Sequence, residues 1–288
     1  MKIKDFFSGD KKARIYTIAG IAALVVVLVC AGILAAGQYR LWKAQKEFEK
    51  LAEATTLPPE TEAVTTTTEE ETSTEEETLG YSEEAARLEE KYGIEIPEKY
   101  IDFDELHKEV SEDIYAWIYI PNTNIDYPVL QRSGDNDYYL KHNLDGSRGK
   151  PGCIYTEDLN SKEFTDYNTV IYGHNMKSGA MFRTLHDFED KSFFDNNQYV
   201  YIYTKDRTLV YKIFAAYTND AKHILNSNDF TSEQGLSDYL EKVFKKAQAE
   251  GYLRDDVAVT GENAILTLST CTTSSDKRYI VQAVLVNE

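Results

Sequence analysis

A cysteine and an arginine stand at a spacing suited to covalent chemistry in this 288-residue chain. Cys271 follows an apolar run, residues 264–270, and a six-residue polar loop, residues 272–277, separates it from Arg278. If the runs on either side of the loop pair as antiparallel strands, the thiol and the guanidinium face each other about 5 Å apart. The cation would then favour the thiolate, and its N–H donors would stabilise an oxyanion formed during acyl transfer. The alternative is a small buried cysteine beside a solvated strand terminus.

Acyl transfer by a thiol also requires a base, and one of the five histidines is placed for that role. His174 directly follows the apolar run of residues 169–173 at a glycine turn, where a strand fixes the side chain yet leaves it open to a ligand. No aspartate or asparagine stands out as a third member of a triad. The other histidines occupy positions typical of ordinary surface or loop residues, and they are His107, His142, His186 and His223.

Eight runs of β-branched or aromatic residues between turn residues predict the strands that position these side chains. They are residues 116–120, 125–130, 152–155, 169–173, 199–204, 209–217, 264–270 and 279–286. A short helix over residues 83–92 precedes the strands, and one long helix over residues 232–250 interrupts them. Ser232 or Thr231 can cap the long helix and Gly251 can end it. The pattern predicts a mainly β fold, a closed or nearly closed antiparallel-rich barrel of about eight strands.

Composition excludes several classes of protein and site. The net charge of −18 argues against general nucleic-acid binding, which needs a basic surface. Hydrophobic residues make up 42% of the chain, which excludes a wholly disordered protein. The three cysteines, Cys30, Cys153 and Cys271, form neither a CxxC motif nor a Cys/His spacing, which argues against a disulfide scaffold and a structural zinc site. We expect no cofactor and no metal.

Residues 15–37 are predicted to form a single transmembrane anchor. No charged residue lies between Arg14 and Arg40, and a helix of about 22 apolar residues spans roughly 33 Å, enough for the hydrocarbon layer of a bilayer. A cleaved signal peptide is the alternative, but its apolar region is usually only about 7–15 residues long. Basic residues are slightly in excess before the helix, which favours a cytoplasmic N-terminus over residues 1–14.

Residues 38–80 are predicted to form an extracellular stalk rich in threonine and glutamate. The segment from 54 to 79 is almost entirely Thr, Glu and Pro, so it has little to bury, and its like charges extend it. A spacer of this kind holds a domain away from a membrane. The remaining residues, 81–288, are predicted to form the folded domain.

Four segments of the domain, in this order, resemble the sortase family. Trp117-Ile118-Tyr119-Ile120-Pro121 with Ile125-Asp126-Tyr127-Pro128-Val129 is similar to the opening strands of the sortase barrel. Tyr172-Gly173-His174 resembles the family's histidine segment, and Thr267-Leu268-Ser269-Thr270-Cys271 followed by Arg278 resembles its TLxTC…R signature. The serine in TLSTC, the helical lead-in and the long helix before the cysteine strand are most similar to class B sortases.

The resemblance implies a membrane-anchored cysteine transpeptidase of Gram-positive bacteria. Cys271 would attack the Thr–Gly bond of a C-terminal sorting signal of the N/S-P-x-T-x type and form a thioester. An amine of a peptidoglycan precursor or cross-bridge would then resolve that thioester. His174 would be the general acid and base, and Arg278 would hold the substrate backbone and the developing oxyanion. The partners implied are surface proteins bearing such a signal, peptidoglycan and the lipid bilayer.

Further substrate contacts are implied by the resemblance alone. Asn136, Leu140, Ser269 and Thr270 match segments that line the class B peptide groove. The alternative for each is an ordinary turn, core or strand residue.

Two other functions are compatible with the sequence, one that uses the same catalytic residues and one in which they have no catalytic role. A surface cysteine peptidase would cleave the same motif with water as acceptor, and the acceptor is not encoded by a side chain. A non-catalytic receptor on a stalk would have a merely structural Cys271, which should resist alkylation.

Overall fold

The computed structural model of the chain describes residues 11–55 and 84–287. Two compact units divide it, one comprising Met1–Lys46 and the other Glu47–Glu288. The second contains all strands and helices named here other than most of the N-terminal helix α1 (Lys11–Ala54).

Helix α1 is long and apolar enough to cross a membrane, judged by its length and composition. Its apolar side chains from Ile15 to Trp42 are largely exposed. The helix does not end at residue 37, where the predicted anchor ends, but continues to Ala54. The reason is local, because residues 38–54 are mainly Leu, Ala, Lys, Glu and Gln, which favour helices.

Residues 47–55, which composition assigns to the stalk, pack as part of the folded unit. Phe48 is only 2% exposed, and its ring meets that of Tyr127 edge-on at 5.5 Å. Lys99 Nζ donates to the Thr55 hydroxyl at 2.9 Å. Residues 56–80 of the predicted stalk lie outside the described residues.

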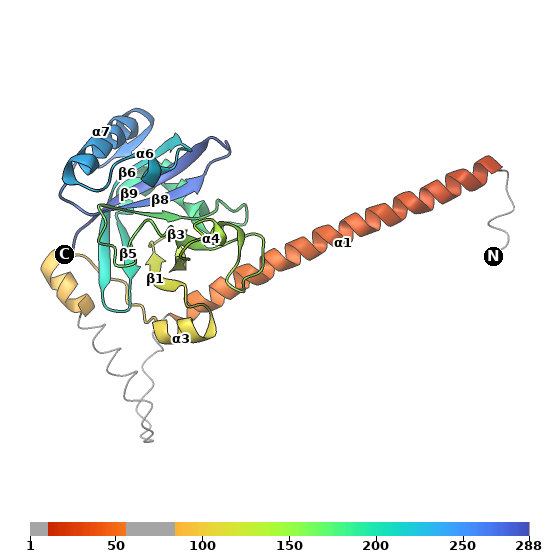
Figure 1. The fold of residues 1–288 in the computed structure, drawn as a ribbon, viewed down its shortest axis with the longest axis horizontal. Coiled ribbons are helices and arrows are strands. Elements are labelled where there is room, and N and C mark those ends of the chain that lie inside the picture. The colour runs from red at the N-terminus through yellow and green to blue at the C-terminus, as the bar shows by residue number, and fades with distance from the viewer. Residues whose placement is uncertain (1–10, 56–83, 288) are drawn as a thin grey trace, which may run out of the picture. The chain divides into compact units, whose positions relative to one another are not determined.

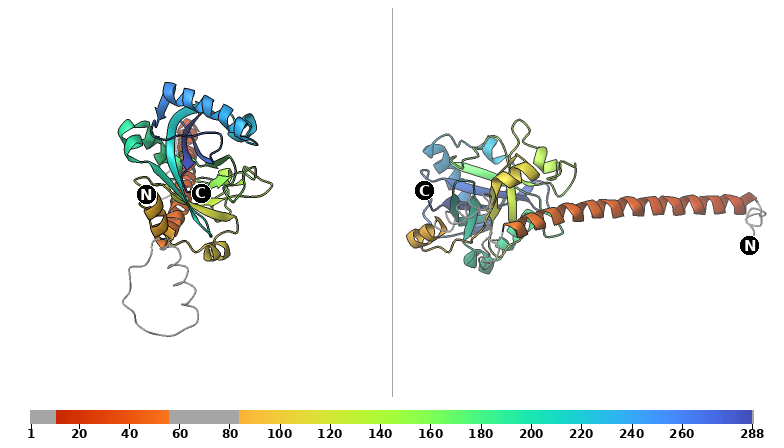
Figure 2. Two further views of the ribbon diagram at one scale, coloured as in Figure 1. Left: turned by 90° about the vertical axis from the view of Figure 1, so that its left-hand side faces the viewer. Right: turned by 90° about the horizontal axis from the view of Figure 1, so that it is seen from below.

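The predicted closed barrel of eight strands is confirmed (Figures 1 and 2). Its strands are β1 (Ile114–Tyr119), β2 (Asp126–Leu130), β3 (Ile154–Thr156), β4 (Asn168–Tyr172), β5 (Tyr199–Tyr203), β6 (Thr208–Asp220), β8 (Ile265–Cys271) and β9 (Lys277–Leu285). They pair in the order β5-β1-β2-β3-β4-β8-β9-β6, and β5 pairs with β6 to close the ring. Most pairings are antiparallel, but β2–β3 and β4–β8 are parallel.

A ninth strand, β7 (Gly251–Leu253), was not predicted. It pairs with β6 beyond the stretch that pairs with β5. Sequence analysis reads Gly251 only as a helix end, whereas a Cβ there would lie 2.2 Å from the Ala216 carbonyl oxygen. The absent side chain thus lets the chain leave the helix and join the sheet directly.

The helices lie outside the ring of strands. They are a helix over residues 84–92, α3 (Phe103–Glu109), α4 (Tyr138–Lys141), the 3₁₀ helix η2 (Phe182–Glu189), α5 (Lys191–Asn196), α6 (Ile224–Ser227) and α7 (Glu233–Glu250). Helix α7 is the predicted long helix, and the Ser232 side chain caps it by accepting from the Gly235 N–H. Its apolar face, which includes Leu236 and Leu240, packs on β6 and β7 (Figure 1).

Candidate active site

Most of the predicted site residues line one cavity of about 180 Å³. They are Leu140, His174, Ser269, Thr270, Cys271 and Arg278. A larger cavity of about 390 Å³ lies elsewhere, lined by residues such as Arg87, Tyr203 and Lys205. The described residues that line that larger cavity include neither a cysteine nor a histidine, so chemistry rather than size singles out the smaller one.

Cys271 and Arg278 are register partners at the ends of β8 and β9, as the six-residue loop predicts. Cys271 is partly exposed. Arg278 Nη1 donates to the carbonyl oxygens of Ser275 and Lys277, at 3.1 Å and 2.9 Å. Both bonds come from one nitrogen, and a guanidinium has five N–H donors. The arginine thus braces the loop while its planar group lies at the thiol's end of the sheet.

His174 directly follows β4, and a hydrogen bond defines which nitrogen of its neutral ring carries the proton. Its Nε2 is 2.8 Å from the Leu140 carbonyl oxygen, and because a carbonyl only accepts, Nε2 must carry hydrogen. Nδ1 is therefore the nitrogen left to exchange a proton. Burial lowers the pKa of His174 and the nearby Lys150 charge lowers it further, while the bond to Leu140 acts in the opposite direction. The neutral imidazole is therefore the prevailing form at pH 7.

Two glycines allow the histidine to sit where it does. A Cβ on Gly173 would lie 2.5 Å from Ile154 Cδ1 and 2.7 Å from Phe182 Cγ, closer than real side chains approach. Gly152 has φ +70°, and a Cβ there would lie 3.3 Å from the His174 ring. Side chains at either position would displace His174 or the strand that carries it.

The parallel pairing of β4 with β8 brings the histidine and the cysteine to one end of the barrel. Tyr172 is the register partner of Ser269, and the Gly173 N–H donates to the Ser269 carbonyl at 3.2 Å. The Thr270 hydroxyl, in a residue only 1% exposed, donates to the Gly173 carbonyl at 2.8 Å. Parallel strands end on the same edge, so the residues after β4 and at the end of β8 must be neighbours.

The predicted substrate residues differ in where they lie. Leu140 lines the cavity and orients His174 through its carbonyl. Ser269 and Thr270 also line it, although the Thr270 hydroxyl is engaged with backbone. Asn136 is not among the residues that line the cavity, and its side-chain oxygen accepts from the Asp158 N–H at 2.7 Å.

Sequence analysis missed several residues that line the same cavity, among them Tyr155, Tyr172 and His223. The two tyrosine rings stack at 5.5 Å. His223 Nδ1 accepts from the Asn226 N–H, so Nε2 carries the proton and lies 2.9 Å from the Glu157 carboxylate. Burial raises the pKa of Glu157. His223 lies in a polar segment after β6, and only Tyr172, beside His174, had a position that pointed to the site.

Comparison with known proteins agrees with this geometry. A sortase domain model matches residues 118–286. Sortase B of Listeria monocytogenes is 37% identical over 191 residues, covering 64% of this chain and 75% of that protein. The crystal structure of Clostridium perfringens sortase B is 30% identical, covers 64% of this chain and all of that one, and superimposes with a TM-score of 0.58. A Staphylococcus aureus sortase B–substrate complex is 27% identical over 75% of this chain and 99% of that one, with a TM-score of 0.57.

A barrel with a strand-end thiol, an arginine opposite it and a histidine on the adjoining strand is suited to acyl transfer through a thioester. The chain belongs to the sortase family. Its relatives within that family are class B sortases, which confirms the resemblance found in the sequence.

Proposed function

We propose that this protein is a membrane-anchored class B sortase that joins secreted proteins to the cell wall. It cleaves a C-terminal sorting signal of the N/S-P-x-T-x type between threonine and glycine. It then transfers the new threonine carboxyl group to an amine of peptidoglycan. The observation that carries the proposal is the register pair Cys271–Arg278, which shares one cavity with His174.

The first half of the reaction forms the acyl-enzyme. Neutral His174 first takes the thiol proton of Cys271 and becomes an imidazolium. The thiolate attacks the threonine carbonyl carbon, and the oxygen gains negative charge that Arg278 donors stabilise. The C–N bond breaks, and the imidazolium of His174 gives its proton to the leaving amine. A thioester and a neutral imidazole remain.

The second half reverses the proton transfer. The acceptor amine attacks the thioester carbonyl, and the neutral His174 takes its proton. The C–S bond breaks, an amide forms and Cys271 leaves as thiolate. Splitting the transfer into two steps is what a covalent nucleophile provides.

Helix α1 would serve as the anchor, with residues 1–14 in the cytoplasm and the barrel outside. The length and apolar character of α1 support an anchor, and the charge bias before it supports the orientation. The predicted stalk, residues 38–80, would then lie outside the cell, on the same side of the bilayer as the barrel. Proteinase added to intact protoplasts should remove the barrel and leave the N-terminus protected, and the reverse pattern would contradict this orientation.

Product analysis tests the reaction itself. The full-length protein in detergent is incubated with a sorting-signal peptide, with or without glycine or a diaminopimelate-containing amine. Transpeptidation predicts a new mass equal to the acyl fragment joined to the amine, in an amount that rises with amine concentration. Release of only the free acid at every amine concentration would instead identify a hydrolase, and no cleavage would contradict the proposed function.

A further inference from the structure

Three side chains outside the predicted site form a network on the backbone of Cys271. Asn175 Nδ2 donates to the Cys271 carbonyl oxygen at 2.8 Å. His186 Nε2 lies 3.0 Å from the same oxygen and 3.0 Å from Asn175 Nδ2. His186 Nδ1 in turn lies 2.6 Å from Glu189 Oε1. The nucleophile's own peptide group is therefore held by side chains of the segment that follows His174.

The proton positions in this network follow from its acceptors. The Glu189 carboxylate accepts, so His186 Nδ1 carries hydrogen. In the neutral ring Nε2 accepts from Asn175, whose two amide N–H groups then serve both Nε2 and the Cys271 oxygen. In the protonated ring Nε2 itself donates to that oxygen. The Cys271 carbonyl has a donor in either form, and in the neutral form that donor is Asn175.

The His186 ring and the Glu189 backbone contact two strands of the sheet. The His186 side chain is 10% exposed, and its ring stacks on that of Tyr279 of β9 at 5.0 Å. The Tyr252 hydroxyl of β7 donates to the Glu189 carbonyl oxygen at 3.1 Å. Strands β9 and β7 therefore hold η2 beside the end of β8.

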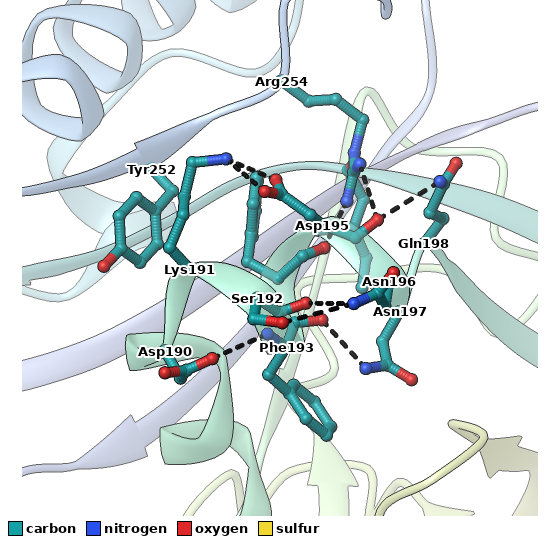
Figure 3. Close-up of polar contacts among 12 residues, drawn as sticks. Asp190, Lys191, Ser192, Phe193, Asp195, Asn196, Asn197, Gln198, Tyr252 and Arg254 are labelled. Atoms are coloured by element: carbon teal, nitrogen blue, oxygen red, sulfur yellow. Dashed lines mark hydrogen bonds and ion pairs between the residues drawn. The ribbon is translucent and has the colours of Figure 1, made fainter.

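Helix α5, which follows η2, is fastened in the same way (Figure 3). Arg254 reaches over its C-terminal end and donates to the Phe194 carbonyl at 2.6 Å and to the Ile213 carbonyl of β6 at 2.9 Å. Its guanidinium also lies over the Phe194 ring, 4.6 Å from the centroid. The whole segment from η2 to α5 is thus tied to the barrel at both ends.

We propose that Asn175 is a positioning residue for the nucleophile and that His186 and Glu189 hold it in place. The proposal rests on the proposed function, because it assigns these residues to a reaction of Cys271 with His174. Strand β8 ends at Cys271, which pairs with Arg278 of β9, and the loop that follows, residues 272–277, is mostly exposed. The Asn175 amide adds a side-chain support at this strand end.

The Asn175 bond holds the carbonyl of the peptide group that begins at Cys271. Because that group is planar, the bond restrains the ψ angle of Cys271 and the position of the Cα atom that carries the thiol. Asn175 is also the residue after His174. One side-chain bond of 2.8 Å therefore connects the backbone of the acid–base residue with that of the nucleophile. Misplacing reacting groups by about 1 Å costs on the order of 100-fold in rate.

The test replaces Asn175→Leu, which keeps the side-chain volume and removes both amide donors. Asn175→Ala serves as a second variant should leucine impair folding. Asn124→Leu is the matched control, because Asn124 Nδ2 donates to the Gly179 carbonyl in the same loop but does not contact Cys271. Adduct formation with a sorting-signal peptide is followed by intact mass under single-turnover conditions, together with KM and the melting temperature.

We expect Asn175→Leu to slow acylation by about 10- to 100-fold, with KM and melting temperature near those of the wild type. Asn124→Leu should acylate like the wild type. His186→Ala should slow acylation less, and His186→Gln should restore part of the loss because its amide can still donate. Wild-type acylation in Asn175→Leu, or a loss that appears only in KM, would overturn the positioning role.

A second measurement needs no substrate, so it separates this inference from the proposed function. The pH profile of Cys271 alkylation by iodoacetamide should contain a step that His174→Ala removes. Asn175→Ala should weaken or remove the same step, since the thiol would no longer face the imidazole, and Asn124→Leu should keep it. An unchanged step in Asn175→Ala would overturn the inference. A wild type that shows this step yet forms no adduct would contradict the proposed function alone.

Discussion

Two thiols of the folded unit lie in contrasting surroundings. Cys271 is partly exposed at the end of β8, opposite Arg278 and in a cavity with His174. Cys153 immediately precedes β3, is 1% exposed, and donates to the His142 carbonyl oxygen at 3.5 Å. Burial raises the pKa of Cys153 well above its usual value.

Proximity to a histidine does not separate these two cysteines. The Cys153 thiol contacts the backbone of His142, whereas Cys271 shares a cavity with His174. The difference lies in solvent access and in the charge that each thiolate would meet. A buried thiol without a cation stays protonated and inert, whereas a strand-end thiol beside a guanidinium can ionise and reach a substrate.

Replacing the nucleophile should have the largest effect. Cys271→Ala should abolish the covalent adduct with a sorting-signal peptide, because the thioester requires that sulfur, and should leave the fold intact. Cys153→Ala should still form the adduct. Intact mass and peptide mapping of the full-length protein in detergent measure both variants. An adduct that maps to Cys153 would show that Cys153, not Cys271, is the nucleophile.

Removing the imidazole should have the next largest effect. His174→Ala should lower turnover by about 10²–10⁴-fold, the usual contribution of a positioned acid–base group. His142→Ala is the matched control from the Cys153 region, where the His142 ring stacks on Tyr138 at 4.0 Å. Turnover of a fluorogenic sorting peptide compares the two variants. Equal activity in both would remove His174 from the mechanism.

Replacing Arg278 tests the role of the guanidinium that lies beside Cys271 but not beside Cys153. Arg278→Ala should lower turnover by roughly 10²–10³-fold, the usual effect of losing an oxyanion donor. Arg278→Lys keeps the charge but loses the planar set of donors, so it should recover only a small part of that loss. The same peptide assay measures both variants. Near-complete rescue by lysine would show that Arg278 acts only by favouring the thiolate.

The barrel and the pair Cys271–Arg278 could be predicted because both depend on local sequence. Alternating apolar runs mark the strands, and a six-residue loop between two of them leaves little choice of register. Strand β7 was missed because three residues after a long helix are too short to show a strand pattern. The packing of residues 47–55 was missed because a single Phe48 in a charged helix gives no signal of burial.

The relation between His174 and Cys271 depends instead on distant pairing. Their strands are joined in parallel by contacts such as Thr270 to Gly173, which are 97 residues apart in the chain. The network of Asn175, His186 and Glu189 is still harder to predict from the sequence. It exists only because η2 packs beside β9, so a histidine in a polar segment looks like any surface histidine until that packing is known.

The smallest effect expected concerns the protonation of His174. Burial is the first cause that lowers its pKa and the Lys150 charge adds to it, so the NMR titration midpoint of this ring should lie below the ordinary value of 6.5. The unfolded chain then binds more protons than the folded one just below that value, so folding stability should fall as the pH falls through this window. Lys150→Glu reverses the neighbouring charge, so it should raise the midpoint and reduce the loss of stability in acid.

The titration is assigned to His174 by comparison with the variant His174→Gln, which lacks the imidazole. A midpoint at or above 6.5 in the wild type, or one that Lys150→Glu lowers, would contradict the described surroundings of the imidazole.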